Sequence, residues 1–259
     1  MMLPQPPRGT LLLVPNALDL GAPDAPPIDA VLPMGVLREA ARLVHWVAED
    51  AKTTRAFLKR VDAVVPLAQP LQAIDIRELP RPAKGAQPAP TPIDLAPLLA
   101  PALAGADIGL ISEAGLPAVA DPGSALVASA HRIGIAVRPL PGPSSLMLAL
   151  AASGLNGQSF AFVGYLPTDA AARTARLHAL QQQSRRERQT QLAIETPYRN
   201  AALMAALLRA LHPDTQLSVA CGLTLPGGWC ATRNVSAWRA DPPTFDHKHL
   251  PAVFLWLAH

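Results

Sequence analysis

The stretch GLISEAGLPAVADPG, residues 109–123, leaves a strand in an unusual way. It continues an apolar run over residues 108–111, which indicates a buried β-strand, and Pro122 suits the first turn of a helix. Between them, residues 112–117 offer no side chain suited to nucleophilic attack or metal binding. The pattern indicates a loop whose backbone serves the function more than its side chains do.

Length and composition indicate a compact globular protein. The chain has 259 residues, of which 50% are hydrophobic and 16% are charged, enough for one large domain or two smaller ones. A formal net charge of +3 is compatible with an anionic partner but far below that of a dedicated nucleic-acid binder. Two cysteines suit a reducing cytosol, and the sequence shows neither a signal peptide nor an apolar run that could span a membrane. We therefore expect a soluble cytoplasmic protein.

Short apolar runs alternate with helical patterns along the first half of the chain. Strands are expected over residues 10–14, 42–48, 107–111 and 135–140, with helices around residues 36–41 and over 52–61, 91–104, 122–133 and 144–153. Asp121 is expected to cap the helix that follows it. This alternation predicts βαβ units and a mostly parallel sheet covered on both faces.

The second half alternates in a different way. Strands are expected over residues 160–166, 191–195, 217–223, 229–235 and 252–257, with helices over residues 169–183 and 199–211 and a basic bend at residues 184–188. Few helices separate the last three strands, which favours an antiparallel or mixed sheet. The predicted fold class is α/β, with an N-terminal subdomain over residues 1–156, a C-terminal subdomain over residues 157–259 and a ligand cleft between them.

The common phosphate and metal signatures do not occur in the sequence: there is no GxGxxG after Val14, no GxxxxGK[ST], no HExxH and no GxSxG. The stretch His247-Lys248-His249 is either an exposed turn or part of a metal site, and since nothing nearby supplies further ligands, we expect no metal. The stretch Arg185-Arg186-Glu187-Arg188 is either a solvated loop or a contact to RNA phosphate.

Two loops of the same style follow strands, at residues 112–117 and 139–145. Ligands of open α/β sheets bind outside the carboxyl ends of strands. Gly115 and Gly142 would let a ligand approach the main chain, and Ser144 and Ser145 would seat a carboxylate at a helix N-terminus. Each loop alone could be a tight turn, but their joint occurrence favours a small ligand held by backbone groups.

These loops also resemble a known family. The stretches ISEAGLPAVADPG (111–123) and IAVRPLPGPSSLMLALAASGL (135–155) resemble the tetrapyrrole methylase-like S-adenosylmethionine methyltransferases, and within them the branch that 2′-O-methylates cytidine in small-subunit ribosomal RNA. In that branch the first loop reads Ser-Asp-Ala-Gly-Thr-Pro followed by Asp-Pro-Gly, and the second reads Pro-Leu-Pro-Gly-Pro. Further matches run in order along the chain: Leu12-Leu13-Val14-Pro15, Ala48-Glu49-Asp50, Gly164-Tyr165-Leu166-Pro167 and the ETPYR stretch at residues 195–199.

The resemblance implies that S-adenosylmethionine is cupped in the cleft, largely by main-chain contacts. The matching positions are Pro15, Ala114, Gly115, Leu116, Val119, Ser144, Ser145, Glu195 and Leu223. This cofactor has no phosphate, so no phosphate-binding loop is expected. The resemblance also implies a homodimer. A 2′-hydroxyl acceptor would benefit from a base, for which Glu49 and Asp50 are candidates, although the same pair could simply cap the helix over residues 52–61. The catalytic residue stays unassigned.

The chain departs from the family pattern where substrate is expected. The family's Pro-Thr-Pro-Ile-Gly-Asn-Leu is PNALDL at residues 15–20, and Glu-Asp-Thr-Arg is Glu-Asp-Ala-Lys at residues 49–52. Arg-Glu-Leu-Thr-Lys becomes CGLTL at residues 221–225, and Lys-Gly-Glu becomes Lys-His-Leu at residues 248–250. Lost cations would have to be replaced, and the expected replacements are Arg173, Arg176, Arg185, Arg186 and Arg188.

Three functions are therefore open. The first is 2′-O-methylation of RNA of the ribosomal type, with the small ribosomal subunit as partner. The second is methylation of a tetrapyrrole or another small acceptor, where a nucleophilic carbon needs less help from a base. The third is a paralogue that binds S-adenosylmethionine without transferring methyl groups.

Overall fold

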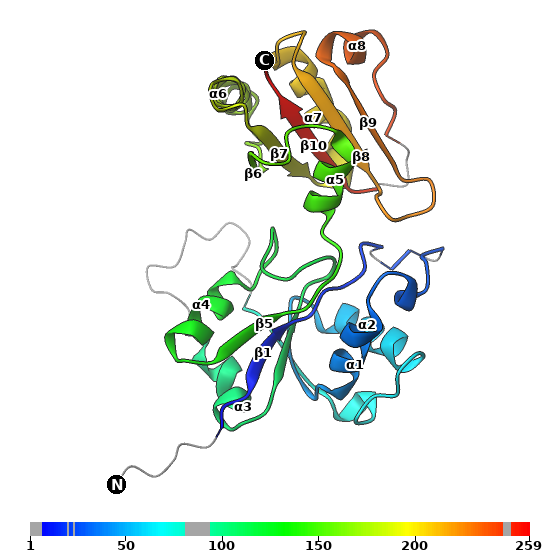
Figure 1. Ribbon diagram of the computed structural model, residues 1–259, viewed down its shortest axis with the longest axis vertical. Coiled ribbons are helices and arrows are strands. Elements are labelled where there is room, and N and C mark those ends of the chain that lie inside the picture. Colours follow the sequence, from blue (N-terminus) through cyan, green and yellow to red (C-terminus); the bar gives the residue numbers. More distant parts are fainter. Residues whose placement is uncertain (1–6, 20, 23, 81–93, 246–249) are drawn as a thin grey trace. The chain divides into compact units, whose positions relative to one another are not determined.

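The chain folds into two compact units, Met1–Pro143 and Ser144–His259 (Figure 1). The computed structural model describes residues 7–19, 21–22, 24–80, 94–245 and 250–259. The division between the units lies ahead of helix α5 (Ser145–Ser153), whereas the sequence places it at residues 156/157. The physical reason for the difference is that α5 packs on strands of the second sheet and buries Leu146, Ala149 and Leu150 there.

The first unit contains a five-stranded sheet with the order β3-β2-β4-β1-β5, and every pair in it is parallel, as predicted. Its strands are β1 (Thr10–Leu13), β2 (His45–Ala48), β3 (Asp75–Glu78), β4 (Ile108–Ile111) and β5 (Ala136–Pro139). The sequence analysis missed β3. Its sequence DIRE is mostly charged, which only an edge strand tolerates, and β3 lies at the edge of the sheet.

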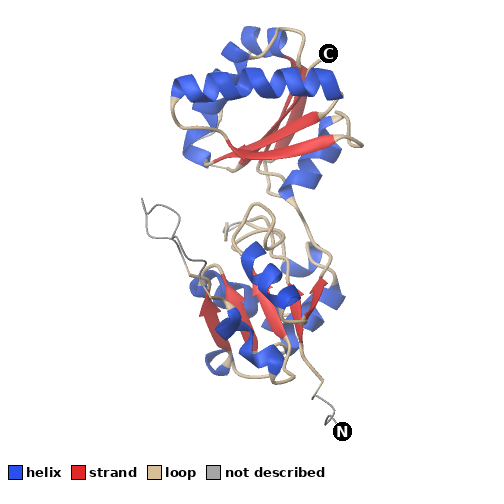
Figure 2. Ribbon diagram, turned by 90° about the vertical axis from the view of Figure 1, so that its left-hand side faces the viewer, coloured by secondary structure: helices blue, strands red, loops and turns tan. Residues whose placement is uncertain are grey.

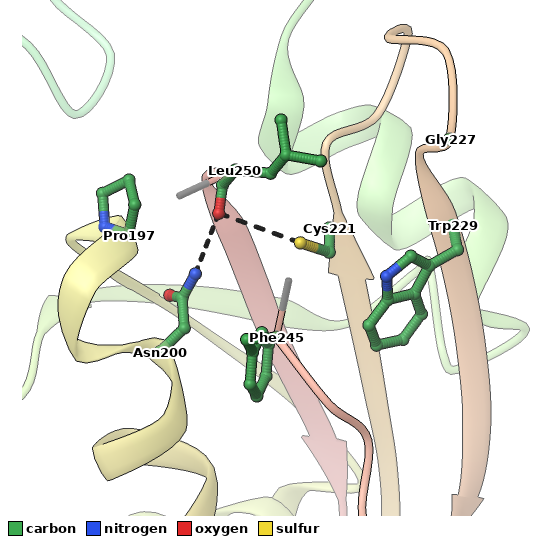
Figure 3. Close-up of a pocket in the computed structure, with 7 residues that line it drawn as sticks. All are labelled: Pro197, Asn200, Cys221, Gly227, Trp229, Phe245 and Leu250. Atoms are coloured by element: carbon green, nitrogen blue, oxygen red, sulfur yellow. Dashed lines mark hydrogen bonds between the residues drawn. The ribbon is translucent and has the colours of Figure 1, made fainter. Parts of the chain in front are cut away.

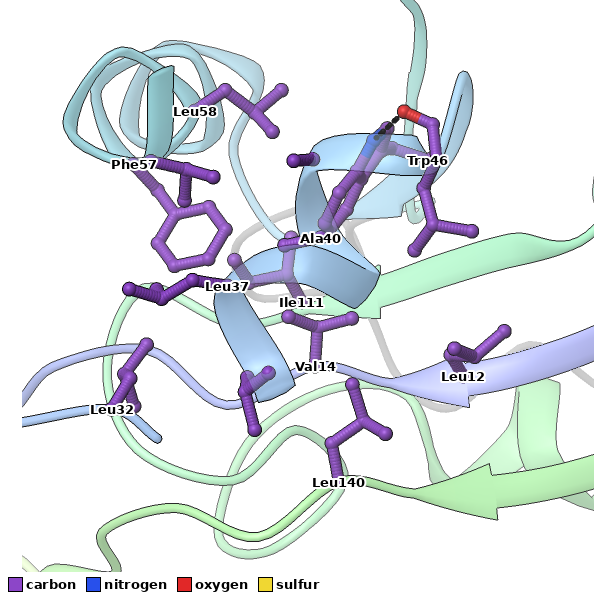
Figure 4. Close-up of a cluster of buried hydrophobic side chains, with 14 of the residues drawn as sticks. Leu12, Val14, Leu32, Leu37, Ala40, Trp46, Phe57, Leu58, Ile111 and Leu140 are labelled. Carbon is purple, nitrogen blue, oxygen red and sulfur yellow. Dashed lines mark hydrogen bonds between the residues drawn. The ribbon is translucent and has the colours of Figure 1, made fainter. Parts of the chain in front are cut away.

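Helices cover both faces of this sheet because successive strand residues point to opposite sides. On one face, α1 (Met34–Arg42) and α2 (Ala51–Asp62) pack on Leu12, Val14, Trp46 and Ile111, and Trp46 meets Phe57 edge-on (Figure 4). On the other face, Leu11, Val47 and Leu110 pack against short helices and α4. The helical segments there are η3 (Ala96–Leu99), α3 (Ala100–Leu103) and α4 (Ser124–Arg132), and the unit also contains η1 (Ile28–Ala30) and η2 (Leu71–Ala73).

The second unit contains a mixed sheet with the order β6-β7-β10-β8-β9. Its strands are β6 (Phe160–Tyr165), β7 (Thr190–Glu195), β8 (Gln216–Cys221), β9 (Trp229–Asn234) and β10 (Ala252–Leu257). Only β6 and β7 pair in parallel; β10 runs antiparallel to β7 and β8, and β9 runs antiparallel to β8. The prediction of an antiparallel or mixed sheet for this half is confirmed.

Helices again lie on both faces of the second sheet (Figure 2). One face carries α6 (Ala170–Glu187), η4 with α7 (Pro197–Arg199 and Asn200–Ala210) and α8 (Val235–Ala240); the other carries α5. The sequence analysis did not predict α8, which has only six residues. Within the described residues, none of the helices has the length and hydrophobicity that a membrane crossing requires.

Two local predictions were wrong. The basic bend expected at residues 184–188 is the last turn of α6, because Ser184 continues the buried stripe of Leu177 and Leu180, and only Arg188 adopts the left-handed conformation that ends the helix. Asp121 is not the N-cap of α4; Gly123, at φ 127, takes that position. This φ is readily available only to glycine, so the backbone rather than the aspartate determines where α4 begins.

The helix expected over residues 91–104 is shorter in the described part of the chain. Residues 91–93 lie outside the described residues, and the remainder forms η3 followed by the four-residue α3. Pro97 and Pro101 cannot donate backbone hydrogen bonds, which accounts for the short segments.

Two glycines of the first unit test how tightly its core is packed. A Cβ at Gly109 of β4 would lie 2.7 Å from the Trp46 ring, whereas a Cβ at Gly35 of α1 would meet nothing within 4 Å. We expect Gly109→Ala to lower the free energy of unfolding by about 1–3 kcal/mol through overpacking. Gly35→Ala should be neutral or stabilising by up to about 1 kcal/mol. Urea titrations measure both, and equal effects of the two substitutions would contradict the packing argument.

Candidate functional site

Four loops emerge side by side at the carboxyl edge of the first sheet. The strand order places β2, β4, β1 and β5 next to one another, and all four run in the same direction. Backbone hydrogen bonds continue past the strand ends: Val14 donates to Leu110, Leu140 donates to Leu13 and Glu49 donates to Ile111, at 2.8–3.1 Å. The loops at residues 112–117 and 139–145 therefore begin at the same edge, where α/β sheets bind ligands.

Asn16 joins the loop after β1 to the loop after β4. Its backbone N–H donates to the Gly115 carbonyl at 2.9 Å, and the Gly115 N–H donates back to the Asn16 carbonyl at 3.1 Å. The Asn16 side chain, only 7% exposed, donates to the carbonyl of Glu113 at 2.9 Å and to that of Ser112 at 3.4 Å, and it accepts the Ala17 N–H at 2.9 Å. This residue fixes the shape of both loops through backbone groups.

Pro15 joins the loop after β1 to the loop after β5. A Cβ at Gly142 would lie 2.3 Å from Cβ of Pro15, so only glycine fits against the proline ring. Pro15 itself is buried. Gly142 was expected to let a ligand approach the main chain. In the structure, Pro15 occupies the space that a side chain at Gly142 would fill.

The loop after β4 has a strained backbone. Gly115 has φ 70, and Ala118 and Ala120 also have positive φ, at 66 and 65. Each such alanine costs about 1–2 kcal/mol relative to ordinary conformations, and strain of this kind gathers at functional sites. Val119, between the two alanines, is 44% exposed. The loop thus has a backbone fixed by internal hydrogen bonds and exposes one apolar side chain, Val119.

Three carboxylates gather beside this loop. Burial, followed by the charges of Glu49 and Glu113, raises the pKa of Asp121 to about 7, while the nearby Ser112 hydroxyl acts in the opposite direction. Glu49 accepts the Glu113 N–H at 3.1 Å. Asp50 is the N-cap of α2, where its carboxylate accepts the Thr53 N–H at 2.8 Å. Of the two roles considered for Asp50, a base and a helix cap, the structure shows the helix cap.

The other predicted site residues lie in the second unit. Ser144 and Ser145 begin α5, where Ser144 is the N-cap without a side-chain capping bond, so its hydroxyl leaves the helix N–H groups unoccupied. Glu195 ends β7 and is buried; its carboxylate accepts the Thr196 N–H at 2.9 Å and pairs with Arg199 at 3.0 Å. Leu223 follows β8 and packs under α5.

A small cavity of about 150 Å³ lies at the ends of β7 and β8 (Figure 3). It is lined by Pro197, Asn200, Cys221, Gly227, Trp229, Phe245 and Leu250. Asn200 and the Cys221 thiol both donate to the Leu250 carbonyl, at 2.9 and 3.8 Å, and burial raises the pKa of Cys221. None of the lining residues is charged, so the arginine and lysine missing at residues 221–225 leave a neutral, partly aromatic cavity.

The predicted basic residues do not form one face. Arg173 donates to the backbone carbonyls of Pro167 and Thr168, and Arg186 pairs with Glu187 at 2.6 Å. Arg176 and Arg185 are nine residues apart on α6, about 2.5 turns, and so point to opposite sides. Arg185 and Arg188 line a common groove.

The described residues contain no cluster of metal ligands, and His247–His249 lie outside them. The roles of two residues near the candidate site, Asn16 and Asp121, were not predicted from the sequence. Asn16 could have been noticed as a polar residue three positions after the end of β1, although its partners lie almost a hundred residues away. Asp121 was noticed, but as a helix cap, because the carboxylates that perturb it come from other loops.

The raised pKa of Asp121 makes stability depend on pH. The folded protein binds the proton more tightly than the unfolded chain, so this stabilisation is present below about pH 4 and is lost as the pH rises towards 7. Asp121→Asn should remove that loss, and the difference in unfolding free energy between variant and parent should grow over this range and level off above pH 7. Urea titrations across pH measure it. Glu113→Gln, which removes one repelling charge, should shift the transition to lower pH; a pH-independent difference would contradict the argument.

Comparison with known proteins places this arrangement in a family. A family model for tetrapyrrole (corrin/porphyrin) methylases matches residues 36–228. Among curated relatives named ribosomal RNA small subunit methyltransferase I, one from Pseudomonas aeruginosa is 45% identical over 95 residues, covering 37% of this chain and 32% of the relative. Another, from Mesorhizobium japonicum, is 39% identical over 127 residues, covering 49% and 42%. The matches thus span less than half the length of these relatives.

Solved structures agree with the fold. Uroporphyrin-III-C-methyltransferase from Thermus thermophilus superposes with a TM-score of 0.51 at 19% identity, covering 96% of this chain and 92% of that one. A cobalt precorrin-4 methyltransferase superposes with a TM-score of 0.54 at 14% identity, covering 96% and 94%. These likenesses establish two α/β units and confirm the predicted fold class. Since the family model covers well over half of the sequence, the chain belongs to the tetrapyrrole methylase family of methyltransferases.

Proposed function

We propose that the protein is an S-adenosylmethionine-dependent methyltransferase that methylates RNA at a 2′-hydroxyl, in the manner of the ribosomal enzymes. The proposal of a cofactor rests on one observation, the fixed loops at the carboxyl edge of the first sheet, which we call the rim. There the loops after β1, β4 and β5 are locked together by the Asn16–Gly115 bridge and by Pro15 against Gly142. A rim of backbone amides, carbonyls and apolar side chains suits a ligand that has no phosphate.

The proposed cofactor contacts are the positions that match the family's cofactor site. In the first unit they are Pro15, Ala114, Gly115, Leu116 and Val119; in the second they are Ser144, Ser145, Glu195 and Leu223. The free amides at the start of α5 suit the carboxylate of the methionine moiety. Because Pro15 is buried and Glu195 is paired with Arg199, these two residues would contribute through their backbone and by supporting neighbouring loops.

S-adenosylmethionine would supply an electrophilic methyl group on a positively charged sulfur. Accurate positioning then provides much of the rate. The ribose 2′-hydroxyl loses its proton on methylation, and a base with a pKa near neutrality is best suited to take it. Asp121 has such a pKa, and Glu49 and Glu113 keep its surroundings negative, which also favours a cationic ligand.

RNA as acceptor is supported by the names of the curated relatives. The neutral cavity beside Cys221 favours the alternative, a small apolar acceptor such as a tetrapyrrole. A third function, that of a paralogue which binds S-adenosylmethionine without methyl transfer, stays open beside these two. The reducing cytoplasm is the proposed location, consistent with the free thiols of Cys221 and Cys230.

Calorimetry with S-adenosylmethionine and its demethylated product tests the cofactor. Gly115→Val should abolish binding, because a β-branched residue at φ 70 would displace the loop and its bridge to Asn16. Gly154→Val is the matched control: Gly154 has φ 68 at the end of α5, with nothing within 4 Å of a Cβ. Both variants should lose about 1–2 kcal/mol of stability from backbone strain, and only the first should lose affinity.

Absence of binding by the parent, or equal affinity of the two valine variants, would contradict the proposed site. Transfer of a labelled methyl group to isolated small ribosomal subunits, with 2′-O-methylcytidine recovered after digestion, then tests the acceptor. Transfer to a tetrapyrrole instead would establish the second function, and binding without transfer to either would establish the third.

We also propose a homodimer. On the edge strand β6, Phe160 and Phe162 are 39 and 37% exposed, and Phe162 pairs with Leu192 and so faces the α5 side of the sheet. Helix α5 packs on β8, β9 and β10 and not on these two phenylalanines. We propose that a second copy of the chain covers them. Light scattering should give about twice the chain mass of 27.3 kDa. The double variant Phe160→Glu/Phe162→Glu should give the monomer, and a monomeric parent would contradict the proposal.

A further inference from the structure

We propose that an open groove on the second unit binds the phosphodiester backbone of RNA. The groove has a volume of about 480 Å³ and is lined by Asn156, Arg185, Arg188, Leu257, Ala258 and His259. It lies between the end of α6, the loop after α5 and the end of β10. This inference rests on the proposed function, which supplies RNA as the acceptor.

Two guanidinium groups without an ion-pair partner among the described residues lie together in the groove. Arg185 and Arg188 are exposed, form no ion pair with any described residue, and share a lining without carboxylate side chains. By contrast, Arg186 pairs with Glu187 outside the groove, Arg173 donates to backbone carbonyls, and Arg176 points to the side of α6 opposite Arg185. An external anion would therefore meet unpaired guanidinium groups here.

The backbone that carries Arg188 is held in place. Arg188 adopts φ 49, a conformation uncommon outside glycine. The Asn156 amide donates to the Arg188 carbonyl at 2.7 Å, and Thr190 Oγ1 donates to the Asn156 carbonyl at 3.0 Å. The loop after α5 is thereby fastened to the end of α6, and the base of the Arg188 side chain has a defined position.

The opposite wall of the groove is fastened to the same helix. Ser184 is fully buried; its hydroxyl donates to the Gln189 carbonyl at 2.8 Å and accepts the Ala258 N–H at 2.9 Å. His259 in turn lies 3.2 Å from Gln216 through its Nε2 atom. The separation between the two arginines and the end of β10 is thus set by hydrogen bonds within the fold.

This arrangement suits a polymer of phosphates better than a single anion. Guanidinium groups bind phosphate oxygens through planar forks, and two forks on one helix end can meet successive phosphates of one strand. Leu257, which is partly exposed, adds apolar surface on which a ribose can pack. A small anion would engage one fork at a time and gain little from the rest of the groove.

Binding of a labelled, unstructured single-stranded RNA to the full chain tests the inference at several salt concentrations. In the double variant Arg185→Ala/Arg188→Ala, the slope of log affinity against log salt should become shallower by about 0.7 for each phosphate that is no longer neutralised, or about 1.4 in all. Arg186→Ala is the matched control, because it removes the same charge from the neighbouring position of the helix but outside the groove. That variant should keep the parental slope.

The inference would be overturned if the parent does not bind RNA, or if Arg186→Ala changes the slope as much as each groove substitution made singly. It would also be overturned if inorganic phosphate displaces RNA at a concentration equal to that of the RNA phosphates. Calorimetry with S-adenosylmethionine on the same preparations separates this failure from failure of the proposed function. If the cofactor binds and the groove variants behave like the control, the groove is excluded while the cofactor site stands. Circular dichroism of each variant verifies that it is folded.

Discussion

The paired backbone hydrogen bonds between Asn16 and Gly115 are the interaction on which the candidate site depends. They connect loops that follow two adjacent parallel strands, beyond the point where the sheet itself can align them. The buried Asn16 side chain strengthens the connection because its amide satisfies two carbonyls of the neighbouring loop. A flexible loop loses conformational entropy when it becomes ordered on binding a ligand. Here the loops are already ordered in the folded protein.

The same constraint explains the unusual composition of the rim. Pro15 packs where Gly142 has no side chain, so the third loop is fixed by shape rather than by hydrogen bonds. Positive φ at Ala118 and Ala120 can persist only because the surrounding loop is held at both ends. The backbone of the rim is therefore held in one conformation by the fold itself.

Charge is distributed unlike the family pattern, and this bears on the acceptor. In the second unit, the family's charged positions at residues 221–225 are neutral here, and a partly aromatic cavity lies beside them. Positive charge is instead free in the groove that Arg185 and Arg188 line. If RNA is the substrate, the cations that meet it lie at the far end of α6 and not at the end of β8.

The sequence by itself determined the alternation of strands and helices, the parallel first sheet, the mixed second sheet and the family. These follow from periodicity and from short motifs with local geometry. Tertiary structure alone decided which side chains meet. The edge strand β3 was hidden by its charges, α6 continued through the expected bend because Ser184 is buried, and the predicted arginines separated onto different sides of that helix. Asp121 looked like a helix cap until the fold brought Glu49 and Glu113 beside it, because a pKa depends on neighbours in space and the chain places those neighbours on two other segments.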